Sequence, residues 1–154
     1  MNIKILDNAV LFPAQPDDKV FTLSANTILN VFKGGSPVSS ESLKRIQENF
    51  EERQYIKIRG FERILFGTGV ALQTPIGQHV LLNALDNISV RKGLIMTSVP
   101  GIINSQYREE IGLLLCNTNQ YLATIEKGEE ICNGILITPE EIFLQEVDEL
   151  MKKH

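Results

Sequence analysis

The sequence predicts an all-β protein, because short apolar segments follow one another at close intervals along most of the chain. Residues 56–59 alternate apolar and polar side chains, as a half-buried strand does. Glycine and proline residues separate the segments, and helical patterns do not alternate with them as parallel βαβ units would require. The predicted strands are residues 3–12, 20–23, 56–59, 64–66, 70–72, 80–82, 94–96, 111–116, 121–125 and 131–137.

Two segments interrupt this pattern and are predicted to be helical. The first is an insert at about residues 37–54, where Leu43, Ile46 and Phe50 recur at helical spacing after a serine that can cap the helix. The second is a C-terminal helix at about residues 139–153, for which Thr138 is the predicted cap and Glu141 completes a capping box. Its apolar stripe consists of Ile142, Phe143, Val147, Leu150 and Met151.

Composition indicates one ordinary globular domain spanning residues 1–154. The chain of 17.3 kDa is 43% hydrophobic and 22% charged. Its net charge of −4 disfavours DNA or RNA as the main partner, and no apolar run approaches the roughly 20 residues of a membrane span. The N-terminal residues lack the core of a signal peptide, and two distant cysteines favour neither a disulfide framework nor a zinc site. We therefore expect a cytoplasmic protein.

A polar turn centred on residues 104–106 lies between two apolar strands, which predicts a β-hairpin. This stretch resembles the third motif of the dUTPase family, the trimeric dUTP pyrophosphatases. Residues 127–133, 66–77 and 10–23 resemble other segments of that family, so the resemblance covers the first twenty or so residues and residues 56–137. The residues that match the third motif in order and spacing are Gly101, Ile102, Ile103, Tyr107, Arg108 and Glu110.

The resemblance implies a dUTPase-like jelly roll or β-barrel that assembles as a homotrimer, with active sites at the subunit junctions. In that family the hairpin reads uracil, its tyrosine packs on the deoxyribose, and its aspartate positions the attacking water. Tyr107 is thus either a stacking residue or a tyrosine that packs across the sheet. Magnesium is implied only if a nucleoside triphosphate is bound. The ligand-binding residues implied by the resemblance are Ser98, Gly101, Ile103, Asn104, Tyr107 and Asn133.

The catalytic position departs from the family pattern. Asn104 stands where the family has its aspartate, and an amide does not accept a proton near neutral pH. General-base assistance worth about 10²–10⁴-fold is therefore lost. Asn104 remains able to hydrogen-bond a ligand without activating water.

The phosphate-binding positions also depart from the pattern. The second motif falls among residues 85–88, which contain no arginine, and the nearest cations are Arg91 and Lys92. Glu130 replaces the arginine of the fourth motif, Asn133 replaces its glutamine, and Thr22 replaces the aspartate of the first motif. The glycine-rich tail of the family is absent.

These observations lead to three hypotheses. The first is a nucleotide-binding homotrimer that binds or sequesters a uracil-type nucleotide, or a signal derived from a nucleotide, with little or no hydrolysis. The second is an active dUTP pyrophosphatase in which another carboxylate, Asp86 or Glu109, replaces the missing base. The third is a regulatory scaffold that binds a partner protein through the two added helices.

Overall fold

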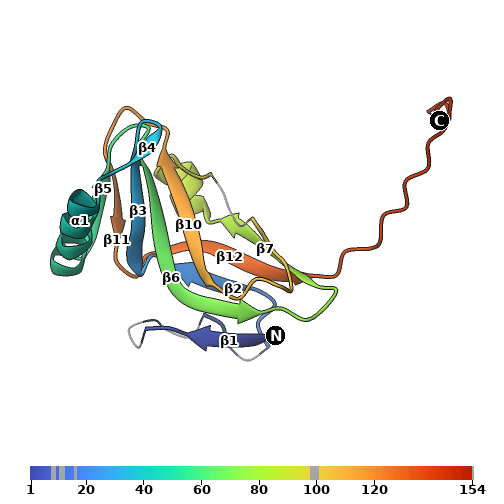
Figure 1. Cartoon of the computed structure of the whole chain (residues 1–154), viewed down its shortest axis with the longest axis horizontal. Coiled ribbons are helices and arrows are strands. Elements are labelled where there is room, and N and C mark those ends of the chain that lie inside the picture. The colour runs from blue at the N-terminus through green and yellow to red at the C-terminus, as the bar shows by residue number, and fades with distance from the viewer. Residues whose placement is uncertain (8–9, 11–12, 16, 98–100, 154) are drawn as a thin grey trace.

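The structure is a computed structural model that describes residues 1–7, 10, 13–15, 17–97 and 101–153. Antiparallel strands form most of it, with one α-helix at one end (Figure 1). The elements are β1 (Asn2–Ile5), β2 (Phe21–Ser24), β3 (Thr27–Lys33), β4 (Ser36–Pro37), α1 (Ser40–Arg53), β5 (Tyr55–Ile58), β6 (Arg63–Gln73), β7 (His79–Ala84), the short helical turn η1 (Asn87–Arg91), β8 (Leu94–Met96), β9 (Ile102–Ile103), β10 (Glu110–Asn117), β11 (Ala123–Glu126) and β12 (Glu130–Ile137). The predicted all-β, jelly-roll-like fold is confirmed.

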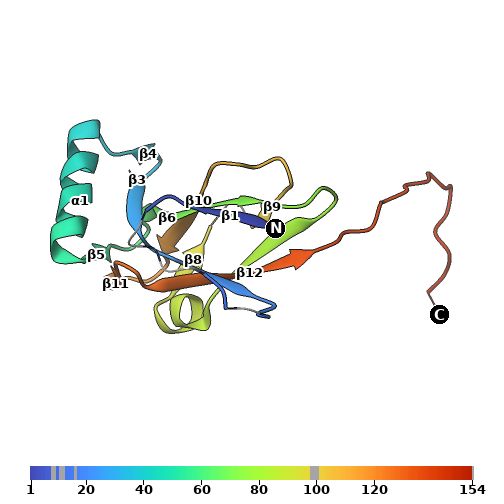
Figure 2. The same cartoon turned by 90° about the horizontal axis from the view of Figure 1, so that it is seen from below.

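Three antiparallel sheets are built from these strands. The largest has the order β4-β3-β6-β10-β8, with β1 also paired to β6, and the second has the order β2-β12-β7-β9. Figures 1 and 2 show these two sheets lying over each other, with the two-stranded β5–β11 ribbon beside α1. Side chains from both sheets fill one common core, as in a sandwich.

β6 is the longest strand, and two glycines allow it to change partner. Its first half pairs with β3 and its last four residues pair with β1, while β10 lies along the opposite edge. At Gly67, between these halves, an added Cβ would collide with the side chains of Thr27 and Glu110. Gly69 has a φ of +69°, which is strained for residues with a side chain. The strand therefore depends on glycine at both positions.

The second sheet contains an equally close approach. The ring of Phe21 on β2 lies directly over Gly134 on β12, where it occupies the space that a Cβ would fill. Phe21 is 8% exposed and Leu23, two residues along the same face of β2, is 1% exposed. The contact between Phe21 and Gly134 thus holds β2 against β12.

The predicted inserted helix is α1. The Ser39 side chain accepts a hydrogen bond from the Ser42 amide at 3.2 Å, which caps the first turn, and Gln54 ends the helix in the left-handed conformation. Phe50 anchors α1 to the sheets, because it is 1% exposed and its ring lies 6.1 Å from that of Phe66. In the described part of the chain, no helix has the length and hydrophobicity needed to cross a membrane.

The predicted C-terminal helix at about residues 139–153 is wrong. These residues have no regular secondary structure and are exposed throughout. Figures 1 and 2 show them as a coil that leads away from the β-sheets. The cap and apolar stripe are local signals, whereas a helix of this length is only marginally stable in water without a surface for its apolar face. As placed, none of residues 139–153 is buried against the described part of the chain.

Replacing Phe50 by alanine should lower the free energy of unfolding by about 3–5 kcal/mol, because a large buried ring is lost at the contact between α1 and the sheets. Denaturant unfolding measures this change. Phe61→Ala is the matched control, since the Phe61 ring is 74% exposed and its loss should change stability by less than about 1 kcal/mol. Equal effects of the two substitutions would contradict the assigned role of Phe50.

Candidate functional site

The turn between β9 and β10 is closed by the side chain of Asn104. Its amide oxygen accepts hydrogen bonds from the backbone N–H groups of Gln106, at 2.9 Å, and Tyr107, at 3.1 Å. This is an Asx turn, in which a side chain takes the place of a backbone acceptor. The turn predicted at residues 104–106 is confirmed, and the Asn104 oxygen is already engaged within it. The predicted β-hairpin is wrong, because β9 pairs with β7 in one sheet whereas β10 pairs with β6 and β8 in the other, so the turn connects the two sheets. We keep the name hairpin for residues 101–110.

Tyr107 is half-buried and packs against the core of the sandwich. Its phenol donates a hydrogen bond to the backbone carbonyl of Glu110 at 3.0 Å. Burial raises the pKa of the Tyr107 phenol, and the negative charges of Glu109 and Glu110 raise the pKa further. Both partners of this bond belong to the hairpin, so Tyr107 holds the turn against β10 in the absence of a ligand.

Glu110 connects the hairpin to the glycine pair of β6. One of its carboxylate oxygens accepts a hydrogen bond from the Gly69 backbone N–H at 3.0 Å. On the other side of the turn, the Arg108 guanidinium donates to the backbone carbonyls of Ser105, at 2.6 Å, and Tyr107, at 3.1 Å. Arg108 therefore stabilises the turn, and Glu110 attaches it to β6.

Two further predicted ligand-binding residues, Gly101 and Ile103, contribute backbone to the sheet. The Gly101 carbonyl accepts a hydrogen bond from the Leu82 N–H at 2.8 Å, and Ile103 is 1% exposed and pairs with Val80 on β7. The Ile103 side chain belongs to the core, so only its backbone is placed to meet a ligand. Predicted residue Ser98 lies outside the described residues.

Asn133 is hydrogen-bonded to Thr22, the residue that replaces the aspartate of the first motif. Its side-chain oxygen accepts a hydrogen bond from the Thr22 hydroxyl at 3.2 Å, across β12 and β2. Asn133 is in register with Asn83 on β7, whereas Ile103 is in register with Val80, three residues earlier on that strand. Two strand spacings and three residues correspond to about 14 Å. Asn133 and Ile103 are therefore not neighbours within one chain.

The segment at the position of the second motif forms η1, and the cation that follows it, the half-buried Lys92, is paired with a carboxylate. Asp86, at the start of η1, is exposed. The Lys92 ammonium lies 2.8 and 2.6 Å from the two carboxylate oxygens of Glu129 and also donates to the Thr124 carbonyl at 2.6 Å. Sequence reasoning missed this ion pair, because its partners are far apart in the chain and no local pattern joins them.

The shallow depression beside this ion pair has mixed charge. Its volume is about 430 Å³, and it is lined by Asn87, Arg91, Lys92, Glu129 and Glu130. Since Glu129 neutralises Lys92, Arg91 and Glu130 leave the depression without an excess of positive charge. A triphosphate would find little electrostatic attraction here.

The donor set does not fit a metal ion held by this chain alone. Among the residues that the structure describes, no three histidine, cysteine, aspartate or glutamate side chains gather closely enough to coordinate one. Mg²⁺ needs near-octahedral oxygen coordination, which is commonly completed by substrate phosphates.

Comparison with known sequences identifies relatives of this chain. The family model for dUTPase matches residues 52–154. The deoxyuridine 5'-triphosphate nucleotidohydrolase of Hydrogenobaculum sp. is 33% identical over 95 residues, which is 62% of this chain and 66% of that protein. The Aquifex aeolicus protein of the same name is 33% identical over 81 residues, or 53% of this chain and 54% of that protein. The chain thus matches about two thirds or less of the length of these relatives.

Solved structures support the same fold over almost the whole chain. The dUTPase from phage phi11 of S. aureus superposes with a TM-score of 0.64 at 14% identity, covering 97% of this chain and 96% of that chain. The EIAV dUTPase superposes with a TM-score of 0.59 at 17% identity and covers 88% of each chain. At such low identity the structures establish the fold alone, whereas the family model covers about two thirds of the chain. The chain therefore belongs to the dUTPase family.

Proposed function

We propose that this protein binds a uracil-type nucleotide, or a ligand derived from one, with little or no hydrolysis. The observation that carries the proposal is the state of Asn104, whose oxygen is occupied by two backbone donors of its own turn. The Asn104 amide holds the turn in one conformation, so the backbone that would contact a ligand is already ordered. The amide has no basic lone pair with which to activate water. A rigid wall favours binding, since little of the site has to be ordered when the ligand arrives.

The charges around η1 support the same proposal. Efficient phosphoryl chemistry relies on cations that stabilise the negative charge of the transferring group. Here Lys92 is neutralised by Glu129, Glu130 is a second carboxylate beside the same depression, and Asp86 at the start of η1 is an exposed carboxylate. An ordered turn at Asn104, together with few free cations around η1, favours ligand binding over hydrolysis.

A homotrimer is part of the proposal. The family resemblance implies one, and the position of Asn133 about 14 Å from Ile103 in the same chain is compatible with a site shared between copies. Val90, Ile95 and Ile102 have exposed fractions of 75%, 51% and 58%, and apolar surface of this kind is available to self-association.

Hydrolysis of dUTP is the second candidate, and the names of the relatives favour it. The Hydrogenobaculum and Fusobacterium nucleatum proteins are both named deoxyuridine 5'-triphosphate nucleotidohydrolases. In this candidate an exposed carboxylate, Asp86 at the start of η1 or Glu109 in the hairpin, takes the place of the missing base.

Regulation through protein contact is the third candidate. Phage dUTPases such as that of Staphylococcus bacteriophage 80alpha control the transfer of virulence genes, and that protein superposes on this chain with a TM-score of 0.66 at 16% identity. In this chain α1 is the added element that such a role would use, because it stands at one end of the sandwich with an exposed outer face.

Incubation with dUTP and Mg²⁺ separates the first two candidates. Formation of dUMP and pyrophosphate should be at least about 100-fold slower than for the Hydrogenobaculum relative assayed in parallel, because base assistance is missing. Turnover within about ten-fold of that relative, abolished by Asp86→Asn or Glu109→Gln, would establish the second candidate instead.

Thermal-shift measurements test the binding part of the proposal independently. A nucleotide present at 100 times its dissociation constant should stabilise the protein by about 2.7 kcal/mol. We expect such a shift with dUMP, dUTP or a cyclic dinucleotide. An unchanged melting temperature with all of these would contradict nucleotide binding.

Replacing Glu129 by glutamine should increase the affinity for dUTP by roughly three- to ten-fold, because the Lys92 ammonium becomes available to the phosphates. Calorimetry with dUTP and with deoxyuridine isolates the phosphate contribution, and deoxyuridine binding should stay unchanged. Glu48→Gln on α1 removes the same charge at a distant exposed position and serves as the control. An equal gain from both substitutions would show that net charge alone matters.

Light scattering of the full chain should give a mass three times the 17.3 kDa of one copy. A trimer is the smallest assembly that fits the implied three-fold arrangement of shared sites. A monomeric mass at micromolar concentration would contradict the trimer and leave the hairpin and Asn133 as separate surfaces.

A further inference from the structure

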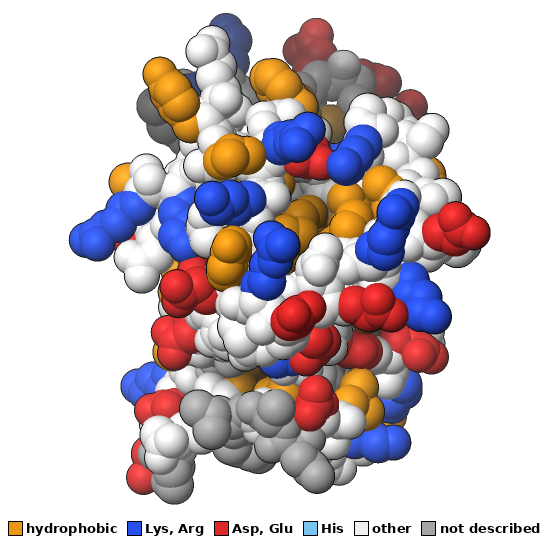
Figure 3. Space-filling view, turned by 90° about the vertical axis from the view of Figure 1, so that its left-hand side faces the viewer, with side chains coloured by type: hydrophobic (Ala, Val, Ile, Leu, Met, Phe, Trp, Pro, Cys, Tyr) orange, Lys and Arg blue, Asp and Glu red, His pale blue; other side chains and the backbone are white. Residues whose placement is uncertain are grey.

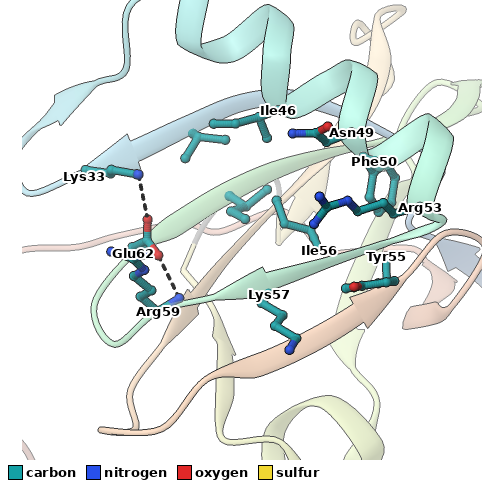
Figure 4. A pocket seen from close by; sticks show the side chains of 12 residues that line it. Lys33, Ile46, Asn49, Phe50, Arg53, Tyr55, Ile56, Lys57, Arg59 and Glu62 are labelled. Carbon is teal, nitrogen blue, oxygen red and sulfur yellow. Dashed lines mark hydrogen bonds and ion pairs between the residues drawn. The ribbon is translucent and has the colours of Figure 1, made fainter.

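A cluster of positive charge borders a cavity between α1 and the strands β3 and β5. The cavity has a volume of about 320 Å³. Its floor is apolar, and four cations border it against a single acid, Glu62 (Figure 4). The residues that line it are Val31, Lys33, Ile46, Asn49, Phe50, Arg53, Tyr55, Ile56, Lys57, Arg59, Glu62 and Ile64. We call this site the α1 pocket.

Three of the four cations have no partner among the described residues. Lys33 lies 3.7 Å from the Glu62 carboxylate, which also accepts a hydrogen bond from the Arg59 backbone N–H at 2.7 Å. Among the described residues, no ion pair or hydrogen bond involves the side-chain nitrogens of Arg53, Lys57 or Arg59. Figure 3 shows Lys and Arg side chains surrounding a hollow with hydrophobic side chains at its base. In a chain with a net charge of −4, such clustering of one sign around apolar surface indicates an occupant that is both acidic and apolar.

The C-terminal tail (residues 138–153) has the complementary character. It carries five acidic and two basic side chains after Thr138. Its large apolar side chains are among the most exposed of the protein, with exposed fractions of 86% for Phe143, 93% for Leu144 and 88% for Leu150. The tail also has the cap, capping box and apolar stripe of an amphipathic helix, which forms only when its apolar face is covered.

The tail begins at the end of the molecule opposite the α1 pocket. Thr138 accepts a hydrogen bond from the Gln78 side chain at 3.1 Å, beside the turn that follows β6, whereas Ile64 at the start of β6 lines the pocket. An eleven-residue strand spans about 36 Å, but fifteen residues of helix span only about 22 Å. A helical tail therefore does not reach the pocket of its own chain.

We propose that the C-terminal tail of one copy docks as an amphipathic helix in the α1 pocket of a second copy. The apolar stripe covers the pocket floor, and the glutamates face Arg53, Lys57 and Arg59. This contact links copies of the chain through a surface separate from the hairpin. It stands independently of whether the protein hydrolyses dUTP.

Photo-crosslinking in the full chain tests the contact directly. Phe143 is replaced by benzoylphenylalanine, light and heavy isotope-labelled chains are mixed, and crosslinked peptides are mapped by mass spectrometry. We expect light–heavy crosslinks to α1 or β5. Crosslinks within one chain only, crosslinks to another surface, or none would overturn the proposal and leave the pocket to a foreign acidic partner.

Charge reversal supplies the matched comparison. Combining Arg53→Glu, Lys57→Glu and Arg59→Glu should reduce the crosslink yield at least about ten-fold, and adding Glu140→Lys, Glu146→Lys and Glu149→Lys in the tail should restore it, since these changes leave the capping-box residue Glu141 in place. The control variant carries Lys4→Glu, Lys19→Glu and Lys44→Glu, which make the same charge change at exposed positions outside the pocket. Far-UV circular dichroism verifies that each variant is folded. Equal loss in the two triple variants, or no restoration, would contradict the proposed contact.

Discussion

The close approach of backbone and side chains at Gly67 and Gly69 of β6 is the constraint on which the rest of the structure depends. At this point β6 leaves β3 and takes β1 as its partner, while β10 continues along its other edge. The Glu110 carboxylate fills the space beside Gly67 and binds the Gly69 N–H. The first residue of β10 is therefore attached to the middle of β6. This attachment fixes the position of the turn at Asn104, which precedes β10.

The polar groups at positions implied as catalytic or phosphate-binding are satisfied inside the chain. Asn104 closes its own turn, Asn133 pairs with Thr22, and Lys92 pairs with Glu129. These three pairings therefore fix side chains whose types, by resemblance to the family, concern ligand binding. Whether a ligand displaces them is decided by the affinity that the binding measurements report.

The fold class was predictable from the sequence because burial imposes a two-residue period on a strand, as the alternately buried residues of β10 show. Local chemistry likewise predicted the cap at Ser39 and the turn at Asn104. The tail helix was predicted wrongly. Pro139 and Glu141 favour the first turn of a helix, but a stable helix also needs a surface that covers its apolar face, and local sequence does not show whether one is present. The separation of Asn133 from the hairpin follows from the strand order β2-β12-β7-β9, which sequence spacing does not encode.

The self-closed turn has a kinetic consequence. Because the Asn104 side chain and the Tyr107 phenol hold the hairpin with bonds made inside one chain, its backbone is already in place when another molecule arrives. Encounters with such a surface need no slow rearrangement, so association is expected at the ordinary docking rates, about 10⁵–10⁷ M⁻¹s⁻¹ for a macromolecular partner. Selectivity between similar molecules then resides in how long each remains bound.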